Sequence, residues 1–378
     1  MPAVDQQLVE CVRHIIKGSE PLKVGVVAQK PSSLSDGFGS SASITFVSSV
    51  EWLEEFKELD VLIVNEALEK EMHDSRALDK FVASALHTLR MGGVLIVRQD
   101  LSKLNDPKKV AMMTDYLDVF RVEENGENVG FSFYAVNEVE DSVYAHQNWQ
   151  DFIWTLSKKS FPGQHGENVT FRSPCFRDFL DRTQYTDTGI FAYEWIFGDN
   201  FISPGGWDQN LAILKRFGPM KTGQRMLDIG VGIGGGARQA ASEFGLHVHG
   251  VDLSANMLAV ALDRVHKDKD ARVTYAICDA TEYDFQPASF DFVFSRDCIH
   301  HIEGTEKLFS RIHNSEFSKL SRIRYKKSCE LQRALKPGGK VLITMYGVGY
   351  GAHSESFKQY YIADDNHNWN FFLAVKPL

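Results

Sequence analysis

The sequence MLDIGVGIGGG, residues 226–236, contains five glycines directly after a short apolar run. Glycine at this density indicates a backbone that turns sharply or that lets another group approach closely. Gly230, Gly232 and Gly235 satisfy the pattern G-x-G-x-x-G, and Asp252 follows the first of them after about twenty residues. Taken alone, this pattern is typical of a loop that binds a dinucleotide.

Acidic residues around the loop favour a different ligand. Asp228 stands two positions before Gly230, at the end of the apolar run, where its carboxylate would repel the pyrophosphate of a dinucleotide. A ligand that carries an ammonium group and a positive sulfonium would be attracted instead. Asp252 suits a ribose diol, and Asp279, which follows a third apolar run, suits an adenine amino group. The three carboxylates predict S-adenosylmethionine as the cofactor, whereas an NAD-dependent oxidoreductase rests on the glycines alone.

Short apolar runs closed by turn residues predict buried strands through the second half of the chain. Helical patterns separate the first of these runs, and strands that alternate with helices indicate a parallel sheet covered on both faces. Such sheets bind ligands at the carboxyl ends of their strands, where all three acidic residues fall, although one such residue alone is often a helix N-cap. The predicted strands are residues 225–229, 247–251, 273–278, 290–295, 340–346 and 369–375, and the predicted helices are 236–244 and 255–266.

The first half of the chain repeats part of this plan without its chemistry. MGGVLIV at residues 91–97 mirrors PGGKVLI at residues 337–343. The opening strand, residues 23–27, leads into AQKPSSLSDG, which has neither an acidic residue at the strand end nor a glycine-rich loop. We interpret this half as a related α/β domain that has lost its cofactor site, although an unrelated α/β domain would give a similar pattern. The predicted domains are residues 1–157 and 182–378, joined by a linker at 158–181.

The composition argues against several classes of protein. The 378 residues carry a formal net charge of -9 and a pI of about 5.8, so no overall positive field attracts nucleic acid or an anionic membrane. Five scattered cysteines form no CxxC pair, which suits a reducing compartment and argues against a disulfide framework or a zinc site. The N-terminal residues do not follow a signal-peptide pattern, and no apolar run approaches the roughly 18 residues of a membrane helix. We therefore expect a cytoplasmic monomer with no metal, no nucleic-acid partner and no membrane insertion.

Several motifs resemble known methyltransferases. DIGVGIGGG, GVDLS, CDAT and LKPGG resemble the class I methyltransferase signature, while residues 182–206 (RTQYTDTGIFAYEWIFGDNFISPGG) and 295–302 (SRDCIHHI) resemble the phosphoethanolamine N-methyltransferase family. An inactive first domain before an active one is similar to the second type of nematode enzyme in that family. The resemblance implies a Rossmann-like class I sheet in the C-terminal half and a degenerate methyltransferase-like domain in the N-terminal half. It also implies methyl transfer from S-adenosylmethionine to mono- and dimethylated phosphoethanolamine, giving phosphocholine for phosphatidylcholine synthesis.

The resemblance assigns roles in catalysis and substrate binding. Tyr185 and His301 match the catalytic pair of the family, and Asp297 and Tyr346 match contacts to the substrate. A phosphobase amine is largely protonated at neutral pH, so a histidine that titrates near neutrality can accept its proton with the help of a hydrogen-bonded tyrosine. Without the motif, His301 would more often be an ordinary loop histidine.

The segment 182–206 is expected to fold over the cofactor as a lid and to exclude water. We expect Trp195 and Phe197 to pack within this lid rather than to contact the substrate. The rings of Tyr185 and Tyr193 would favour a cationic ligand. The predicted cofactor contacts, which combine positions matched to the family with two from the strand and glycine loop, are Gln184, Tyr193, Ile202, Ser203, Asp228, Gly230, Gly232, Asp252, Leu253, Asp279, Ala280 and Arg296.

Two departures from the family pattern leave the activity open. A basic segment at residues 313–333 is inserted before LKPGG, and we interpret it as a helix extension or an exposed excursion rather than a nucleic-acid patch. After Tyr360 the chain lacks the segment that carries the family's sixth strand and the Arg, Tyr and Lys that grip the substrate phosphate. The chain is thus either an active methyltransferase, with phosphate donors such as Arg322, Arg324 or Lys327, or a truncated variant that binds S-adenosylmethionine but is catalytically impaired.

Overall fold

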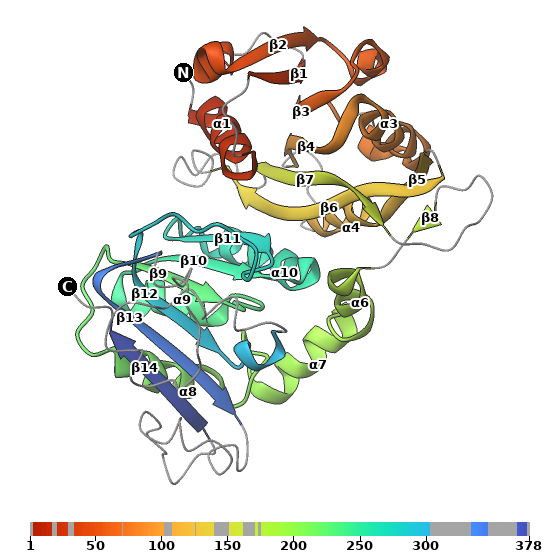
Figure 1. The fold of residues 1–378 in the computed structure, drawn as a ribbon. Coiled ribbons are helices and arrows are strands. Elements are labelled where there is room, and N and C mark those ends of the chain that lie inside the picture. Colours follow the sequence, from red (N-terminus) through yellow and green to blue (C-terminus); the bar gives the residue numbers. More distant parts are fainter. Residues whose placement is uncertain are drawn as a thin grey trace, which may run out of the picture. The chain divides into compact units, whose positions relative to one another are not determined.

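The computed structural model describes residues 3–16, 21–28, 34–69, 71–101, 108–124, 126–139, 151–161, 171–172, 175–302, 334–346 and 369–375. Contacts within the chain divide it into two compact units, Met1–Thr183 and Gln184–Leu378. Both units combine a β-sheet with flanking helices, which confirms the predicted α/β fold class (Figure 1). Within the described residues no helix is long and apolar enough to cross a membrane.

The first unit is a mixed sheet with helices. Its strands are β1 Leu22–Ala28, β2 Ala42–Val47, β3 Leu59–Asn65, β4 Leu89–Asp100, β5 Phe120–Glu124, β6 Glu127–Glu138, β7 Asp151–Phe161 and β8 Phe171–Arg172. Its helices are α1 Ala3–Ile15, α2 Leu34–Phe38, α3 Ser75–Thr88, α4 Lys109–Val119 and α6 Phe176–Thr183, with 3-10 turns η1 Gly39–Ser41, η2 Val50–Glu55 and η3 Glu71–His73. The order is β2-β1-β3-β4-β7-β6, in which β2, β1, β3 and β4 are parallel and β7 and β6 are antiparallel to their neighbours. β5 pairs with β6 and with β8.

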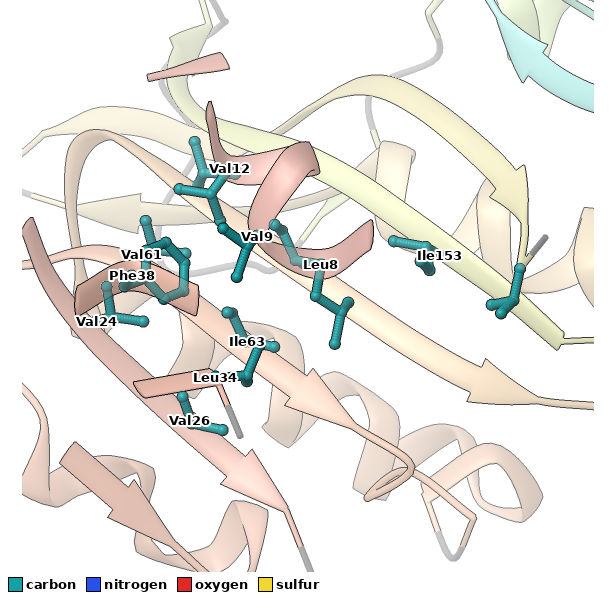
Figure 2. Close-up of a cluster of buried hydrophobic side chains, with 13 residues drawn as sticks. Leu8, Val9, Val12, Val24, Val26, Leu34, Phe38, Val61, Ile63 and Ile153 are labelled. Carbon is teal, nitrogen blue, oxygen red and sulfur yellow. The ribbon is translucent and has the colours of Figure 1, made fainter. Parts of the chain in front are cut away.

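Part of the core of the first unit lies between α1, α2 and one face of this sheet (Figure 2). The apolar residues of α1 recur at helical spacing, so Leu8, Val9 and Val12 fall on one side of the helix and are buried. Val24 and Val26 alternate along β1 and join the same cluster. Burial of these side chains, which stabilises by roughly 25 cal/mol per Å² of apolar surface, fixes the helix on the sheet.

The second unit is a parallel sheet with one antiparallel edge strand. Its strands are β9 Arg225–Ile229, β10 His247–Asp252, β11 Val273–Cys278, β12 Phe290–Arg296, β13 Leu335–Tyr346 and β14 Trp369–Val375. Its helices are α7 Asp187–Phe197, α8 Gly206–Leu214, α9 Gly235–Phe244 and α10 Ala255–Asp268, with 3-10 turns η5 Lys215–Phe217 and η6 Ile299–His301. The order is β14-β13-β12-β9-β10-β11. From β9 the chain adds β10 and β11 on one side, and it then returns to add β12 and β13 on the other side, which creates a topological switch point. Ligands of open α/β sheets bind at such a switch point.

All the predicted strands of the second half are present. The one large difference from the predicted bounds is the start of β13, and it has a counterpart at β4 in the first half. β13 begins at Leu335, ahead of the expected start at Lys340, and its pairing with β12 shifts register across the Pro-Gly-Gly sequence. The pairing of β4 with β3 shifts in the same way across Met-Gly-Gly. Gly92 and Gly338 each have a positive φ, of 76° and 74°. Glycine is favoured at both positions because the backbone is left-handed there.

The predicted linker, residues 158–181, needs correction. It includes the end of β7 and most of α6, and the two units divide after Thr183. Lys158 is only 5% exposed, and its ammonium group donates to the carbonyl oxygens of Leu86 at 2.7 Å and Leu89 at 2.9 Å. These bonds satisfy a buried charge inside a strand, so a lysine at this point does not mark the end of the domain.

The two departures from the family pattern fall mainly outside the described residues. The insert at 313–333, with Arg322, Arg324 and Lys327, lies there, as does the stretch on both sides of Tyr360. β14, predicted as a strand without its hairpin partner, pairs antiparallel with β13 from Trp369 to Val375. Among the described strands none pairs with the other edge of β14.

Candidate functional site

The glycine loop connects β9 to α9 at the switch point of the sheet. Gly230, Gly232 and Gly234 have φ values of 75°, 56° and 79°, and Gly234 is the N-cap of α9. These left-handed conformations strain any residue with a Cβ atom. The loop therefore requires glycine for its own backbone, independently of any ligand.

Protein atoms also approach these glycines closely. A Cβ atom on Gly230 would lie 2.2 Å from Sγ of Cys298, and one on Gly235 would lie 2.0 Å from the carbonyl oxygen of Asn200. Ile202, a predicted cofactor contact, lies 3.2 Å from the corresponding position on Gly232. Two segments distant in sequence thus pack on the loop: the residues after α7, and the residues after β12.

Asp252 ties the end of β10 to the glycine loop. Its Oδ2 atom accepts a hydrogen bond from the Gly232 amide at 2.8 Å, and its Oδ1 atom accepts one from the Ser254 amide at 2.9 Å. Burial raises the pKa of this carboxyl, although the backbone amides oppose the shift. Each carboxylate oxygen has two acceptor positions, so the group retains capacity for a ribose diol.

Asp279 directly follows β11 and stabilises the turn there. Its Oδ1 atom accepts hydrogen bonds from the amide of Thr281 at 2.8 Å and from the hydroxyl of Thr281 at 2.7 Å. The capping role that competes with ligand binding is thus present at this position. A hydrogen bond from adenine to Asp279 would therefore be accepted by Oδ2.

Asp228 lies near the end of β9, just before the glycine loop. It is 4% exposed, and burial, followed by the charge of Asp252, raises the pKa of its carboxyl to about 7 while Arg296 acts in the opposite direction. A buried anion is costly without a compensating positive charge. The position beside the glycine loop therefore favours a cationic ligand group.

Arg296, a predicted cofactor contact at the end of β12, also holds the segment that leads into α8. Its Nη1 atom donates to Oδ1 of Asn210 at 3.0 Å and to the carbonyl oxygen of Gly206 at 3.3 Å, and Nη2 donates to the carbonyl oxygen of Pro204. Burial lowers the pKa of this guanidinium to about 10. Asn210 in turn donates to Oε1 of Gln239 in α9 at 2.7 Å. Sequence reasoning missed Asn210 because nothing local marks a buried amide inside an amphipathic helix.

The lid segment packs on the glycine loop and on α10. Ile190 of α7 is fully buried and forms a cluster with Ile233 and Met257, against which Tyr185 and Ile202 also pack. Helix α7 lies within the segment predicted as the lid, and closure over the cofactor stays a prediction. Trp195 contradicts its expected role, since its side chain is 87% exposed rather than packed within the lid. The ring of Phe197 stacks with that of Tyr193 at a centroid distance of 6.4 Å.

The predicted catalytic and substrate residues lie at the ends of β12 and β13 and before α7. His301 is the last residue of η6, and its amide donates to the carbonyl oxygen of Cys298 at 2.8 Å. Burial lowers the pKa of the His301 imidazole, which favours the neutral base. Asp297 has a left-handed φ of 54°, and its amide donates to the carbonyl oxygen of Thr344 at 3.0 Å. The pairing of Tyr185 with His301 stays a prediction.

The described residues thus place the predicted site at the carboxyl ends of the strands of the second sheet. Gln184, Tyr193 and Ser203 belong to the lid segment, and Tyr346 ends β13. Leu253 follows Asp252, the last residue of β10, and Ala280 follows Asp279, the first residue after β11. In the part of the chain that the structure describes, no group of three or more His, Cys, Asp or Glu side chains is arranged to hold a metal ion. The arrangement offers carboxylates and backbone groups for an organic cation.

Comparison with known proteins identifies the family. The sequence profile "Phosphoethanolamine N-methyltransferase 2 N-terminal" matches residues 2–162, and a methyltransferase domain profile matches residues 226–315. The chain is 52% identical over 321 residues to phosphoethanolamine N-methyltransferase 2 of Caenorhabditis elegans, which covers 85% of this chain and 68% of the relative. The chain belongs to the phosphoethanolamine N-methyltransferase family. A more distant member, phosphoethanolamine N-methyltransferase 1 of Zea mays, is 31% identical, and the match covers 63% of its length.

Solved structures of this family match the whole chain. The phosphoethanolamine N-methyltransferase 2 of Haemonchus contortus in complex with S-adenosylmethionine superposes with a TM-score of 0.86 at 54% identity, covering 100% of both chains. The same enzyme in complex with phosphomonomethylethanolamine and S-adenosylhomocysteine gives a TM-score of 0.85 at 55% identity. Both matches confirm the class I methyltransferase fold and the resemblance to the second nematode type. Phosphoethanolamine N-methyltransferase 1 of the same worm, at 11% identity and a TM-score of 0.63, shows the shared fold alone.

Proposed function

We propose that this chain transfers methyl groups from S-adenosylmethionine to mono- and dimethylated phosphoethanolamine, which gives phosphocholine. The observation that carries the proposal is the buried Asp228 beside the glycine loop, in a chain of the phosphoethanolamine N-methyltransferase family. A buried carboxyl beside the glycine loop suits the cationic end of S-adenosylmethionine and opposes a pyrophosphate. Asp252 and Asp279, at the next two strand ends, suit the ribose and the adenine.

The residues that would hold the cofactor follow from this geometry. Asp228 would face its charged amino acid end, and Asp252 would accept from the ribose hydroxyls while it keeps its bonds to the loop amides. When bound, S-adenosylmethionine supplies an electrophilic methyl group. Ile202, whose Cδ1 atom lies near Gly232, would cover the cofactor on the side of the lid.

His301 is proposed to remove the proton that blocks the reaction. A protonated amine has no lone pair to direct at the methyl carbon, so its proton must leave before transfer. The imidazole of His301 is held in its neutral form by burial, and one of its ring nitrogens would take that proton. Tyr185, at the root of the lid, would orient the imidazole through its hydroxyl group.

The phosphobase would be held by residues at the ends of two strands. Asp297 and Tyr346 would contact the phosphobase from the ends of β12 and β13. The first unit would lack a cofactor site, because no glycine-rich loop follows its opening strand. The carboxylates of Asp151 and Glu66 are already paired with Arg98, at 2.5 Å and 3.0 Å. We further propose a cytoplasmic monomer without nucleic-acid partners, whose phosphocholine serves phosphatidylcholine synthesis.

A titration with the phosphobase tests this function. Phosphomonomethylethanolamine is titrated by calorimetry into protein saturated with S-adenosylhomocysteine, and methyl transfer is measured on the same preparation. Binding with turnover supports the proposal. Binding of the cofactor product without binding of the phosphobase would instead favour the impaired variant, because the site described here belongs largely to the cofactor.

A further inference from the structure

A partly buried ion pair joins the lid helix to α10. Nη1 of Arg264 lies 2.7 Å from Oε1 of Glu194, and Nη2 of Arg264 lies 2.7 Å from Oε2. The Glu194 and Arg264 side chains are only 14% and 17% exposed. The interaction is therefore a bidentate pair with little access to water, a class that contributes more than an exposed surface pair. Burial opposes ionisation of the Glu194 carboxyl, but the hydrogen bonds from Arg264 and from the Asn200 amide, with the charge of Arg264, lower its pKa below the usual value, so it is ionised at neutral pH.

Asn200 connects this pair to the glycine loop. Its amide donates to Oε1 of Glu194 at 2.6 Å, and its side-chain oxygen accepts from Nη1 of Arg264 at 3.2 Å and from Nη2 of Arg238 in α9. The backbone of Asn200 is left-handed, with a φ of 73°, and its carbonyl oxygen lies against Gly235. The end of the lid is thus held by both α9 and α10.

The beginning of the lid is held by α10 as well. Nδ2 of Asn256 donates to the carbonyl oxygen of Tyr185 at 2.9 Å. Asn256 and Arg264 are separated by about 12 Å along α10 at 1.5 Å per residue. Their partners Tyr185 and Glu194 follow in the same direction, so α7 lies beside α10 with an attachment near each end.

We propose that Glu194 and Arg264 are positioning residues that hold the lid closed over the glycine loop and thereby place Tyr185 for methyl transfer. The inference rests on the proposed function. Opening of the lid must break the bidentate pair together with the hydrogen bonds that Asn200 accepts from Arg264 and Arg238, because Asn200 and Glu194 belong to the same segment. The fraction of closed lid then sets the affinity for the cofactor and the rate of transfer, since a competent state that is only partly populated weakens apparent binding by that fraction.

The test measures lid opening and catalysis separately in Glu194→Gln and Arg264→Lys. Arg264→Lys keeps the charge but loses the bidentate geometry. We expect hydrogen exchange of the α7 amides to accelerate about tenfold, the dissociation constant of S-adenosylhomocysteine to rise to a similar degree, and kcat to fall with little change in the KM of the phosphobase. The Glu194→Gln and Arg264→Lys double variant should be little worse than either single variant, because all remove one interaction.

The control is Lys267→Gln, which removes an exposed pair with Asp263 on the same helix. It should leave lid exchange and cofactor affinity unchanged. Exchange in β9 and β12 reports global unfolding, so a variant that merely fails to fold is recognised. Unchanged α7 exchange in both Glu194→Gln and Arg264→Lys would overturn the inference. Exchange and S-adenosylhomocysteine binding need no turnover, so this result is distinguishable from failure of the proposed function.

Discussion

We predict that S-adenosylmethionine expels a proton from Asp228 when it binds. In the free protein, burial and then the charge of Asp252 raise the pKa of the Asp228 carboxyl to about 7. At pH 7 roughly half of the molecules therefore carry this proton. Two positive groups on the ligand return the pKa toward its usual range. Roughly half a proton then leaves per ligand bound at pH 7, roughly 0.9 at pH 6 and roughly 0.1 at pH 8.

Calorimetry measures this number directly. The enthalpy of binding is determined in two buffers that differ in ionisation enthalpy, and its change from one buffer to the other gives the protons released. Asp228→Asn is the matched control, because the amide has the same shape but does not ionise, while His301 still titrates in it. A release of zero in the wild-type protein between pH 6 and pH 8, or the same release in the Asn variant, would refute the reasoning.

The same pKa fixes the sign of an effect on stability. The Asp228 carboxyl has a higher pKa in the folded protein than its ordinary value of 3.8. The folded state therefore holds the proton more tightly, and this contribution to stability is lost as the pH rises from about 4 to about 7. The difference corresponds to about 4 kcal/mol above pH 7. Asp228→Asn should thus raise the unfolding temperature of the free protein at pH 8 and change it much less at pH 4; a lower unfolding temperature at pH 8 would contradict this.

Four further substitutions test the site. His301→Ala should reduce turnover about 10²- to 10⁴-fold and leave S-adenosylhomocysteine affinity within about twofold. Tyr185→Phe should reduce turnover by a smaller factor, again with little effect on that affinity. Near-normal turnover in both variants would show that neither residue takes part in catalysis. Gly235→Ala places a Cβ atom against the Asn200 carbonyl and should lower the free energy of unfolding in urea by about 1–3 kcal/mol. An unchanged midpoint would mean that the backbone at Asn200 moves aside without loss of stability. Asn210→Ala leaves Gln239 and Arg296 short of a buried partner and should cost a similar amount; a neutral result would show that water replaces the amide.

The sheet of the second unit was predictable because its strands are buried on both faces. Runs such as residues 225–229 and 273–278 are short, mostly apolar segments followed by a glycine or an acidic residue, and their observed bounds agree with the predicted ones. The acidic residues at the strand ends were predictable for the same reason. The end of a strand and the following residue can be located from local sequence alone.

The contacts that complete the site were not predictable in this way. Cys298 and Asn200 lie against Gly230 and Gly235, but they are far away in sequence, and no local pattern marks a residue that packs on a distant glycine. Burial of Trp195 was expected because aromatic residues in an apolar helix are usually buried, whereas α7 buries only Ile190 fully. Long-range packing decides these positions, and a single sequence does not contain that information explicitly.

Helix α10 links cofactor binding to closure of the lid. Its N-cap, Ser254, accepts a hydrogen bond from the Met257 amide at 3.1 Å, and the Ser254 amide donates to the Asp252 carboxylate proposed to bind the ribose. The same helix carries Asn256 and Arg264, which hold the lid. A helix of this length moves as one body, so an adjustment at Asp252 reaches both attachments. By linkage, a closed lid strengthens cofactor binding to the same extent that bound cofactor favours the closed lid. Tyr185 would then reach its catalytic position mainly after the cofactor is in place, which favours ordered binding with the phosphobase second.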